Sequence, residues 1–146
     1  MRLLLPCGLV LALSCAVTRS VTAMPKHMKI SKGDADVLRY ALSLEHIEAA
    51  FYNWVASTDM FSAFPAAAQQ YVPLIQAHEN AHVKLLTSVL GPQAGPACTN
   101  YPFEQLVTDY ASFLSLALTF ENLGVSAYDF AIKARARACK VFERGY

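Results

Sequence analysis

Four residues of the sequence have the side chains and the spacing of a metal site, namely Glu45, Glu79, His82 and Glu121. Glu79 and His82 form a Glu-x-x-His pair, which places an oxygen and a nitrogen ligand one turn apart on one face of a helix. A carboxylate combined with an imidazole suits iron, manganese or zinc better than calcium or copper(I). Glu48 and His78 stay open as further ligands or as groups that support the ligands.

Three helical segments are expected to position these side chains. Asp34 or Asp36 can cap the first segment, and Pro73 either kinks the second segment or marks its true start. No segment shows the apolar alternation of a strand, so the sequence predicts an all-α fold. The expected helices span residues 34–57, 65–90 and 103–137.

On a helical wheel, the acidic residues fall inside the apolar faces of these helices. Glu45 lies on the apolar face of the first helix, Glu79 on that of the second and Glu121 on that of the third. Buried carboxylates are unfavourable unless they are paired, protonated or bound to a cation. Arg39 and Lys84 are expected on the outer faces, so a bound divalent metal is the stronger remedy, with protonation of crowded carboxylates as the alternative.

Each of these residues, taken alone, has an ordinary structural explanation. A single glutamate can extend its carboxylate to water, and His82 alone could be a hydrogen-bonded core histidine. His46 is expected to face outward, and the tyrosines at positions 40, 52, 110 and 128 are interpreted as packing residues. The convergence of carboxylates from three helices on one level is what favours a metal site.

The segment between the second and third helices is long enough to cross a helical bundle. Residues 91–102 contain two Gly and three Pro, and could span roughly 40 Å when extended, whereas the second helix would be roughly 35 Å long. Antiparallel neighbours need far shorter connections. The segment therefore predicts the long crossover of ferritin-type four-helix topology.

At these residues the sequence resembles the ferritin-like family that contains plant desiccation-related proteins and fungal secreted stress-response proteins. The resemblance implies that Glu45, the pair Glu79 and His82, and Glu121 are ligands from successive helices, with iron as the expected metal. Full catalysis would then be the oxidation by O₂ of a carboxylate-bridged pair of iron(II) ions. The similar stretches, within residues 34–130, are DADVLRYALSLEHIEAAFY from Asp34, IQAHENAHVKLLTSVLG from Ile75, CTNYPF from Cys98 and FENLGVSAY from Phe120.

The sequence departs from the family pattern at its end. A ferritin-like site takes one Glu from each of two helices and a Glu-x-x-His pair from each of the other two. Here the third helix runs into AIKARARACKVFERGY, and Glu143 has no His three positions later. We therefore expect a truncated domain whose fourth helix is missing, and whose apolar faces are covered in a homo-oligomer or leave it marginally stable.

Length, composition and the first residues limit the remaining possibilities. With 146 residues, of which 55% are hydrophobic, the chain is expected to form one domain with a sizeable core. A net charge of +1 argues against nucleic-acid binding. Arg2, an uncharged apolar stretch and small residues up to Ala23 predict a secretory signal peptide, with a short membrane anchor as the alternative.

The mature protein is then expected to be extracellular and free of the membrane. Two functions are compatible with it: a stress-related protein with a carboxylate and histidine metal site, or a non-enzymatic structural or stress-protective protein without metal. Whether it is an enzyme and whether Cys98 pairs with Cys139 stay open. The expected divisions are a signal peptide at 1–23, a disordered lead-in at 24–33, the ferritin-like domain at 34–137 and a divergent tail at 138–146.

Overall fold

The protein is built from three long helices and shorter helical segments. The computed structural model describes residues 30–143, with side chains through Lys133, so the expected signal peptide at 1–23 lies outside the described residues. No strand occurs within this range, which confirms the all-α prediction. The elements are α1 (Lys32–Ala56), the 3₁₀ helix η1 (Asp59–Ala63), α2 (Ala66–Leu90), the 3₁₀ helix η2 (Gly91–Gln93), α3 (Phe103–Leu106) and α4 (Tyr110–Glu143).

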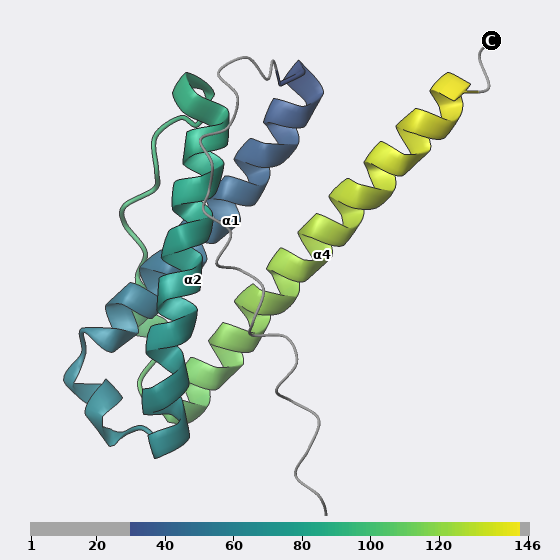
Figure 1. Ribbon diagram of the computed structural model, residues 1–146. Coiled ribbons are helices and arrows are strands. Elements are labelled where there is room, and N and C mark those ends of the chain that lie inside the picture. Colours follow the sequence, from purple (N-terminus) through teal and green to yellow (C-terminus); the bar gives the residue numbers. More distant parts are fainter. Residues whose placement is uncertain (1–29, 144–146) are drawn as a thin grey trace, which may run out of the picture.

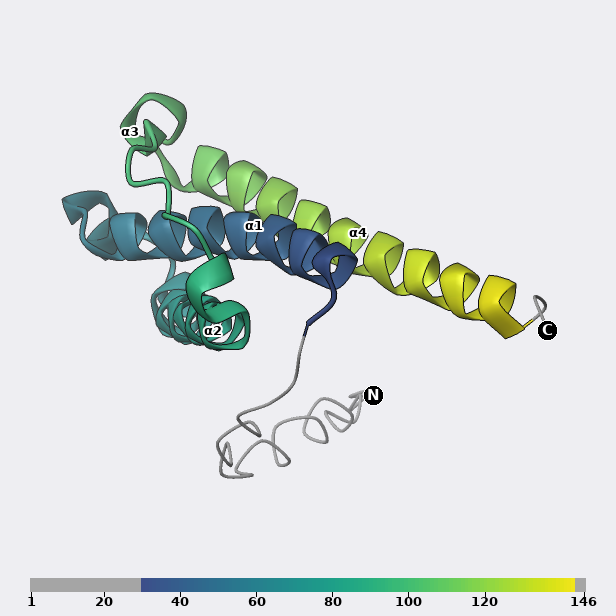
Figure 2. The same ribbon diagram turned by 90° about the horizontal axis from the view of Figure 1, so that it is seen from above.

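The long helices are arranged around α1. Helix α2 packs against α1 in the opposite direction, and α4 lies along α1 and runs in the same direction as α2 (Figure 1, Figure 2). The segment at 91–102 returns along the length of the helices to reach α3 and α4, as the sequence predicts (Figure 1). Within the described range, no helix has the combination of length and apolar character that a membrane span requires.

The start of α1 differs from the expected one. Ser31, and neither Asp34 nor Asp36, caps the helix, because the Ser31 hydroxyl accepts a hydrogen bond from the backbone N–H of Asp34 at 3.1 Å. Lys32 and Gly33 consequently belong to α1 and not to the lead-in. Helix α2 starts at Ala66 as expected and continues through Pro73.

The expected third helix is broken near its beginning. It forms the short helix α3, an extended Val107 and then α4, which continues past Arg137 to Glu143. The break has a local cause in reciprocal capping: the Asp109 carboxylate accepts from the N–H of Ser112 at 2.7 Å, and the Ser112 hydroxyl accepts from the N–H of Asp109 at 3.1 Å. Hydrogen bonds that the Ser112 hydroxyl and then the Ser112 backbone N–H donate to the Asp109 carboxylate lower the pKa of Asp109.

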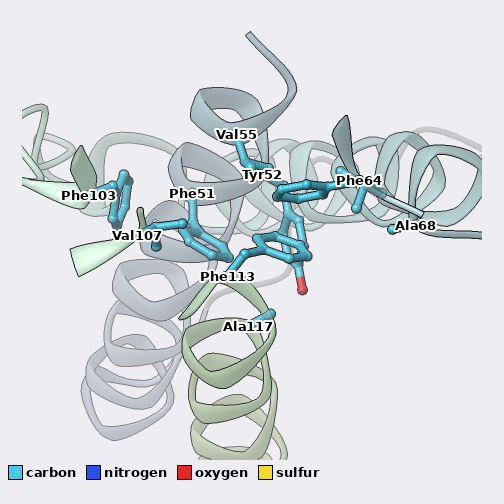
Figure 3. Close-up of a cluster of buried hydrophobic side chains, with 10 residues drawn as sticks. Phe51, Tyr52, Val55, Phe64, Ala68, Phe103, Val107, Phe113 and Ala117 are labelled. Carbon is cyan, nitrogen blue, oxygen red and sulfur yellow. The ribbon is translucent and has the colours of Figure 1, made fainter. Parts of the chain in front are cut away.

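Two apolar clusters hold the helices together, one on each side of the glutamates along α1. The larger cluster is aromatic, and the Phe51 ring at its centre contacts five other rings at centroid distances of 5.2–6.5 Å. Figure 3 draws three of these partners, Tyr52, Phe103 and Phe113. The smaller cluster joins the other ends of α1 and α2. The buried members are Phe51, Tyr52, Val55, Phe64, Ala68, Val72, Phe103, Val107, Phe113 and Ala117 in the larger, and Ala35, Ala41, Leu42, Leu86 and Leu90 in the smaller.

Several residues that the helical wheel places on apolar faces are exposed. They lie on all three long helices, so the described helices do not cover the faces that the sequence predicts to be buried. This group is Val37, Tyr40, Tyr71, Leu85, Leu114, Leu118, Val125, Tyr128 and Ile132.

Replacing Phe51 with Ala should lower the free energy of unfolding by roughly 3–5 kcal/mol, because a fully buried aromatic ring is lost from the core. The matched control is Phe130→Ala in α4, where the ring is 74% exposed and the expected loss is below about 1 kcal/mol. Denaturant unfolding followed by circular dichroism measures both. Equal losses would contradict the central place of Phe51 in the core.

Candidate metal centre

The three long helices bring four glutamate side chains and one imidazole to a common cavity of about 420 Å³. Helix α1 contributes Glu45 and Glu48, α2 contributes Glu79 and His82, and α4 contributes Glu121. These side chains meet because α1 and α2 run antiparallel, so residues equally far from their connection lie at the same level. The cavity lies between the two apolar clusters, of which the larger joins all three helices and the smaller joins α1 and α2.

Three of these side chains form a compact set of possible ligands. The Nδ1 atom of His82 lies 3.0 Å from Oε2 of Glu45 and 3.0 Å from Oε2 of Glu79. One ligand atom from each of the three lies within 4.8 Å of the others. Two oxygens and one nitrogen are therefore close enough to contact a single ion.

Two tyrosines donate hydrogen bonds to glutamates of the cavity. The Tyr52 hydroxyl donates to Oε1 of Glu121 at 2.7 Å, and the Tyr128 hydroxyl donates to Oε1 of Glu45 at 2.6 Å. Tyr52 also belongs to the aromatic cluster, but its hydroxyl oxygen projects out of it (Figure 3). Burial, followed by the bond to its carboxylate, raises the pKa of each tyrosine, so each stays a donor.

A glycine allows α4 to approach Glu48 closely. A Cβ atom added at Gly124 would lie 3.0 Å from Oε1 of Glu48, which is tighter than ordinary van der Waals contact. Gly124 therefore leaves room for the Glu48 carboxylate, one turn of α4 after Glu121.

The cavity concentrates carboxyl groups in a buried position. Glu45, Glu48 and Glu79 are at most 6% exposed, and the side chains described around the cavity include no Lys or Arg. Burial, together with the neighbouring carboxylate of Glu45, raises the pKa of Glu48 to about 8. Burial and then hydrogen bonding with Glu45 raise the pKa of Glu79 to about 7. Burial alone would lower the pKa of His82, but Glu45 and Glu79 outweigh it and raise that pKa.

The structure places all four residues of the predicted site around this cavity, in two groups. Glu45, Glu79 and His82 form the compact set, whereas Glu121 lines the cavity through its contact with Tyr52. Their role as ligands stays a prediction.

The structure also separates the two residues that the sequence leaves open. Glu48 is buried in the cavity, whereas His78 is exposed and does not line it. His46, expected to face outward, is partly buried and does not line the cavity either. Gly124 and Asp129 line the cavity without having been predicted, and the only sequence signal for Gly124 is a glycine inside a helix.

A family model for the ferritin-like domain matches residues 33–138, which is most of the chain. The chain belongs to the ferritin-like domain family. Comparisons with curated proteins and with solved structures give no significant match. The all-helical structure agrees with this family. The cluster of Glu45, Glu79 and His82 in the domain is compatible with a metal site.

The donor set of this ferritin-like domain fits a metal cation. Carboxylate and imidazole groups from three helices converge without a cationic side chain among those described around the cavity. A cation would supply the missing positive charge and would use the oxygen and nitrogen atoms that already face one another.

The metal-free protein should lose stability as the pH rises from about 5 to 9. Glu48 and Glu79 hold protons in the folded state up to pKa values of about 8 and 7, against 4.5 ordinarily, and His82 is shifted in the same direction. The folded state therefore binds these protons more tightly than the unfolded state does. The free energy of unfolding falls as the pH rises and these groups ionise. We expect the Tm in EDTA to fall by several degrees over this range.

Two further measurements separate this effect from general alkaline destabilisation. Glu48→Gln should flatten the slope, whereas Glu104→Gln, at an exposed position in α3, should not. Adding Mn²⁺ should oppose the fall, because a cation favours the ionised carboxylates. A Tm in EDTA that rises with pH would show that these groups are not buried as described.

Proposed function

We propose that this protein binds a metal ion, with iron as the first candidate and manganese or zinc as the alternatives, through Glu45, Glu79 and His82. The observation that carries the proposal is the compact set of two buried carboxylates and one imidazole, whose ligand atoms lie within 4.8 Å of one another. Two more glutamates line the same cavity: Glu121, which is a predicted ligand, and Glu48, which the sequence leaves open. Such oxygen and nitrogen donors suit iron, manganese and zinc.

The chain's own residues explain how such an ion would be reached and held. The His82 side chain is 51% exposed, so one side of the cluster is open to solvent, whereas Glu45 and Glu79 lie in the interior. These carboxylates would bind and orient the ion. Iron held there would supply one-electron redox chemistry.

Metal binding is tested with the purified protein after removal of metal by a chelator. We expect saturable binding of Fe²⁺ under anaerobic conditions, and of Mn²⁺ or Zn²⁺, by calorimetry and elemental analysis. Glu79→Gln and His82→Ala should each weaken binding by at least about tenfold. His78→Ala is the matched control, because His78 lies one turn earlier in α2 and is exposed.

This experiment distinguishes the two candidate functions, a metal-binding protein and a protein without metal. Retention of wild-type affinity by both Glu79→Gln and His82→Ala would overturn the assignment of these ligands. A wild-type protein that binds none of these metals would leave the other candidate, a non-enzymatic structural or stress-protective protein that keeps the fold.

We further propose that the protein is secreted and related to the stress-response and desiccation-related branch of the family. Support comes from the signal-like residues 1–23 and from the resemblance of stretches such as FENLGVSAY to that branch.

We also propose that two copies of the chain associate through α4. The α4 stripe, defined as Leu114, Leu118, Glu121, Val125, Tyr128 and Ile132, has alternating spacings of four and three residues, which is the heptad pattern of paired helices. Leu118, Val125 and Ile132 are each more than 60% exposed. An antiparallel pair of α4 helices would cover both stripes with one self-complementary contact.

The length of α4 supports a second copy of the chain as the partner. Its 34 residues exceed the 25 of α1, and its C-terminal part extends beyond the N-terminal end of α1 (Figure 2). The stripe also includes Glu121 and Tyr128, which line the metal cavity, so a second copy would cover the open side of that cavity.

Val125→Lys should shift the protein from dimer to monomer at micromolar concentration, because a charged side chain would lie in the centre of the paired stripes. Sedimentation equilibrium measures the change. Thr119→Lys, an exposed position of α4 outside the stripe, should leave the dimer unchanged. A wild-type protein that stays monomeric up to high micromolar concentration would exclude a second copy as the occupant of this face.

A further inference from the structure

The open side of the metal cavity carries an aspartate that the proposed ligand set does not use. Among the exposed residues that the structure describes around the cavity, Asp129 of α4 is the one with a carboxylate. A cation that arrives from solvent therefore meets Asp129 before it reaches the buried glutamates. These exposed residues are His82, Val125, Tyr128, Asp129 and Ile132.

Asp129 belongs to a row of α4 residues that passes from the interior of the site to its surface. Four residues exceed one helical turn by about 40°, so each member of a row with this spacing lies further round the helix than the one before. Glu121 is bonded to α1, Asp129 lines the cavity at its opening, and Lys133 does not line it. The row consists of Glu121, Val125, Asp129 and Lys133.

The lysine that follows in this row partly neutralises the aspartate. The Lys133 ammonium donates a hydrogen bond to Oδ2 of Asp129, and the two side chains are 64% and 57% exposed. An exposed ion pair of this kind is weak, because water screens both charges. A divalent cation can therefore replace the ammonium on the carboxylate without disturbing the fold.

We propose that Asp129 is the entry residue of the metal cavity: it captures a hydrated divalent cation at the opening, and Lys133 competes with that cation for the carboxylate. The inference rests on the metal site proposed above and adds the route by which an ion reaches Glu45, Glu79 and His82. Asp129 lies beside the α4 stripe and is not part of it, so a second copy of the chain would leave it at the edge of the contact.

An entry residue has a kinetic signature that a resident ligand lacks. A carboxylate that holds the ion only in passage lowers the barriers to entry and to release equally, so it changes both rate constants and leaves Kd unchanged. Its attraction for the ion acts through solvent, like that of a charge at the rim of an interface. The effect on association therefore fades when salt shortens the Debye length from about 30 Å at 0.01 M to about 3 Å at 1 M.

The test is stopped-flow binding of Co²⁺ to the full chain after metal removal, with release followed by a chase with EDTA. At roughly 0.01 M ionic strength we expect Asp129→Asn to lower both rate constants about threefold to fivefold, with Kd within about twofold of wild type. At about 1 M salt the variant and the wild type should associate equally fast. Lys133→Gln should raise the association rate constant at low salt, because the competing ammonium is removed.

Asp59→Asn is the matched control for the loss of one negative charge. Asp59 is an exposed aspartate in η1, and it does not line the cavity. We expect this variant to bind and release Co²⁺ at the wild-type rates. A decrease equal to that of Asp129→Asn would show that only the net charge of the protein matters, and would overturn the entry role.

The remaining outcomes separate this inference from the proposed function. Binding of Co²⁺ by the wild type, with the same association rate constant in Asp129→Asn at low salt, would overturn the entry role alone. A loss of affinity in Asp129→Asn that arises only from faster release would also overturn it, because Asp129 would then be a resident ligand. A wild type that binds no metal would overturn the metal site and the entry role together.

Discussion

The burial of like charges is the constraint on which the rest of this molecule depends. Four glutamates from three helices share one cavity, and three of them are almost completely removed from water. Such an arrangement is stable only if protons or a cation reduce the repulsion. The larger apolar cluster joins α1, α2 and α4, and the smaller one joins α1 and α2, so the carboxylates cannot separate without loss of core packing.

The parts of the structure that follow from local sequence were predictable. The spacing of Glu79 and His82 places both on one face of α2, and the depth of Glu45 in α1 matches that of Glu79. The Gly and Pro residues between Gly91 and Pro102 predict the long crossover, which the fold confirms. These inferences need only helical periodicity and chain length, which depend little on how the helices meet.

The parts that depend on contacts between helices, or on a competing local signal, were not predictable. The room for the Glu48 carboxylate beside α4 depends on the close approach of that helix at Gly124, which a helical wheel of α1 does not contain. Tyr52 and Tyr128 were interpreted as packing residues, because their acceptors lie on another helix. The break before α4 was missed because apolar periodicity continues through Val107, whereas the capping pair of Asp109 and Ser112 decides where the helix begins.

The crossed tyrosine contacts also determine how α1 and α4 can slide past each other. Apolar side chains tolerate a shift of one turn, since another apolar group then fills the same space. A shift of one turn, about 5.4 Å, would break both phenol contacts together, because the two pairs share one alignment. Two hydroxyl groups thus select one longitudinal alignment of these helices, whereas apolar faces alone would allow several.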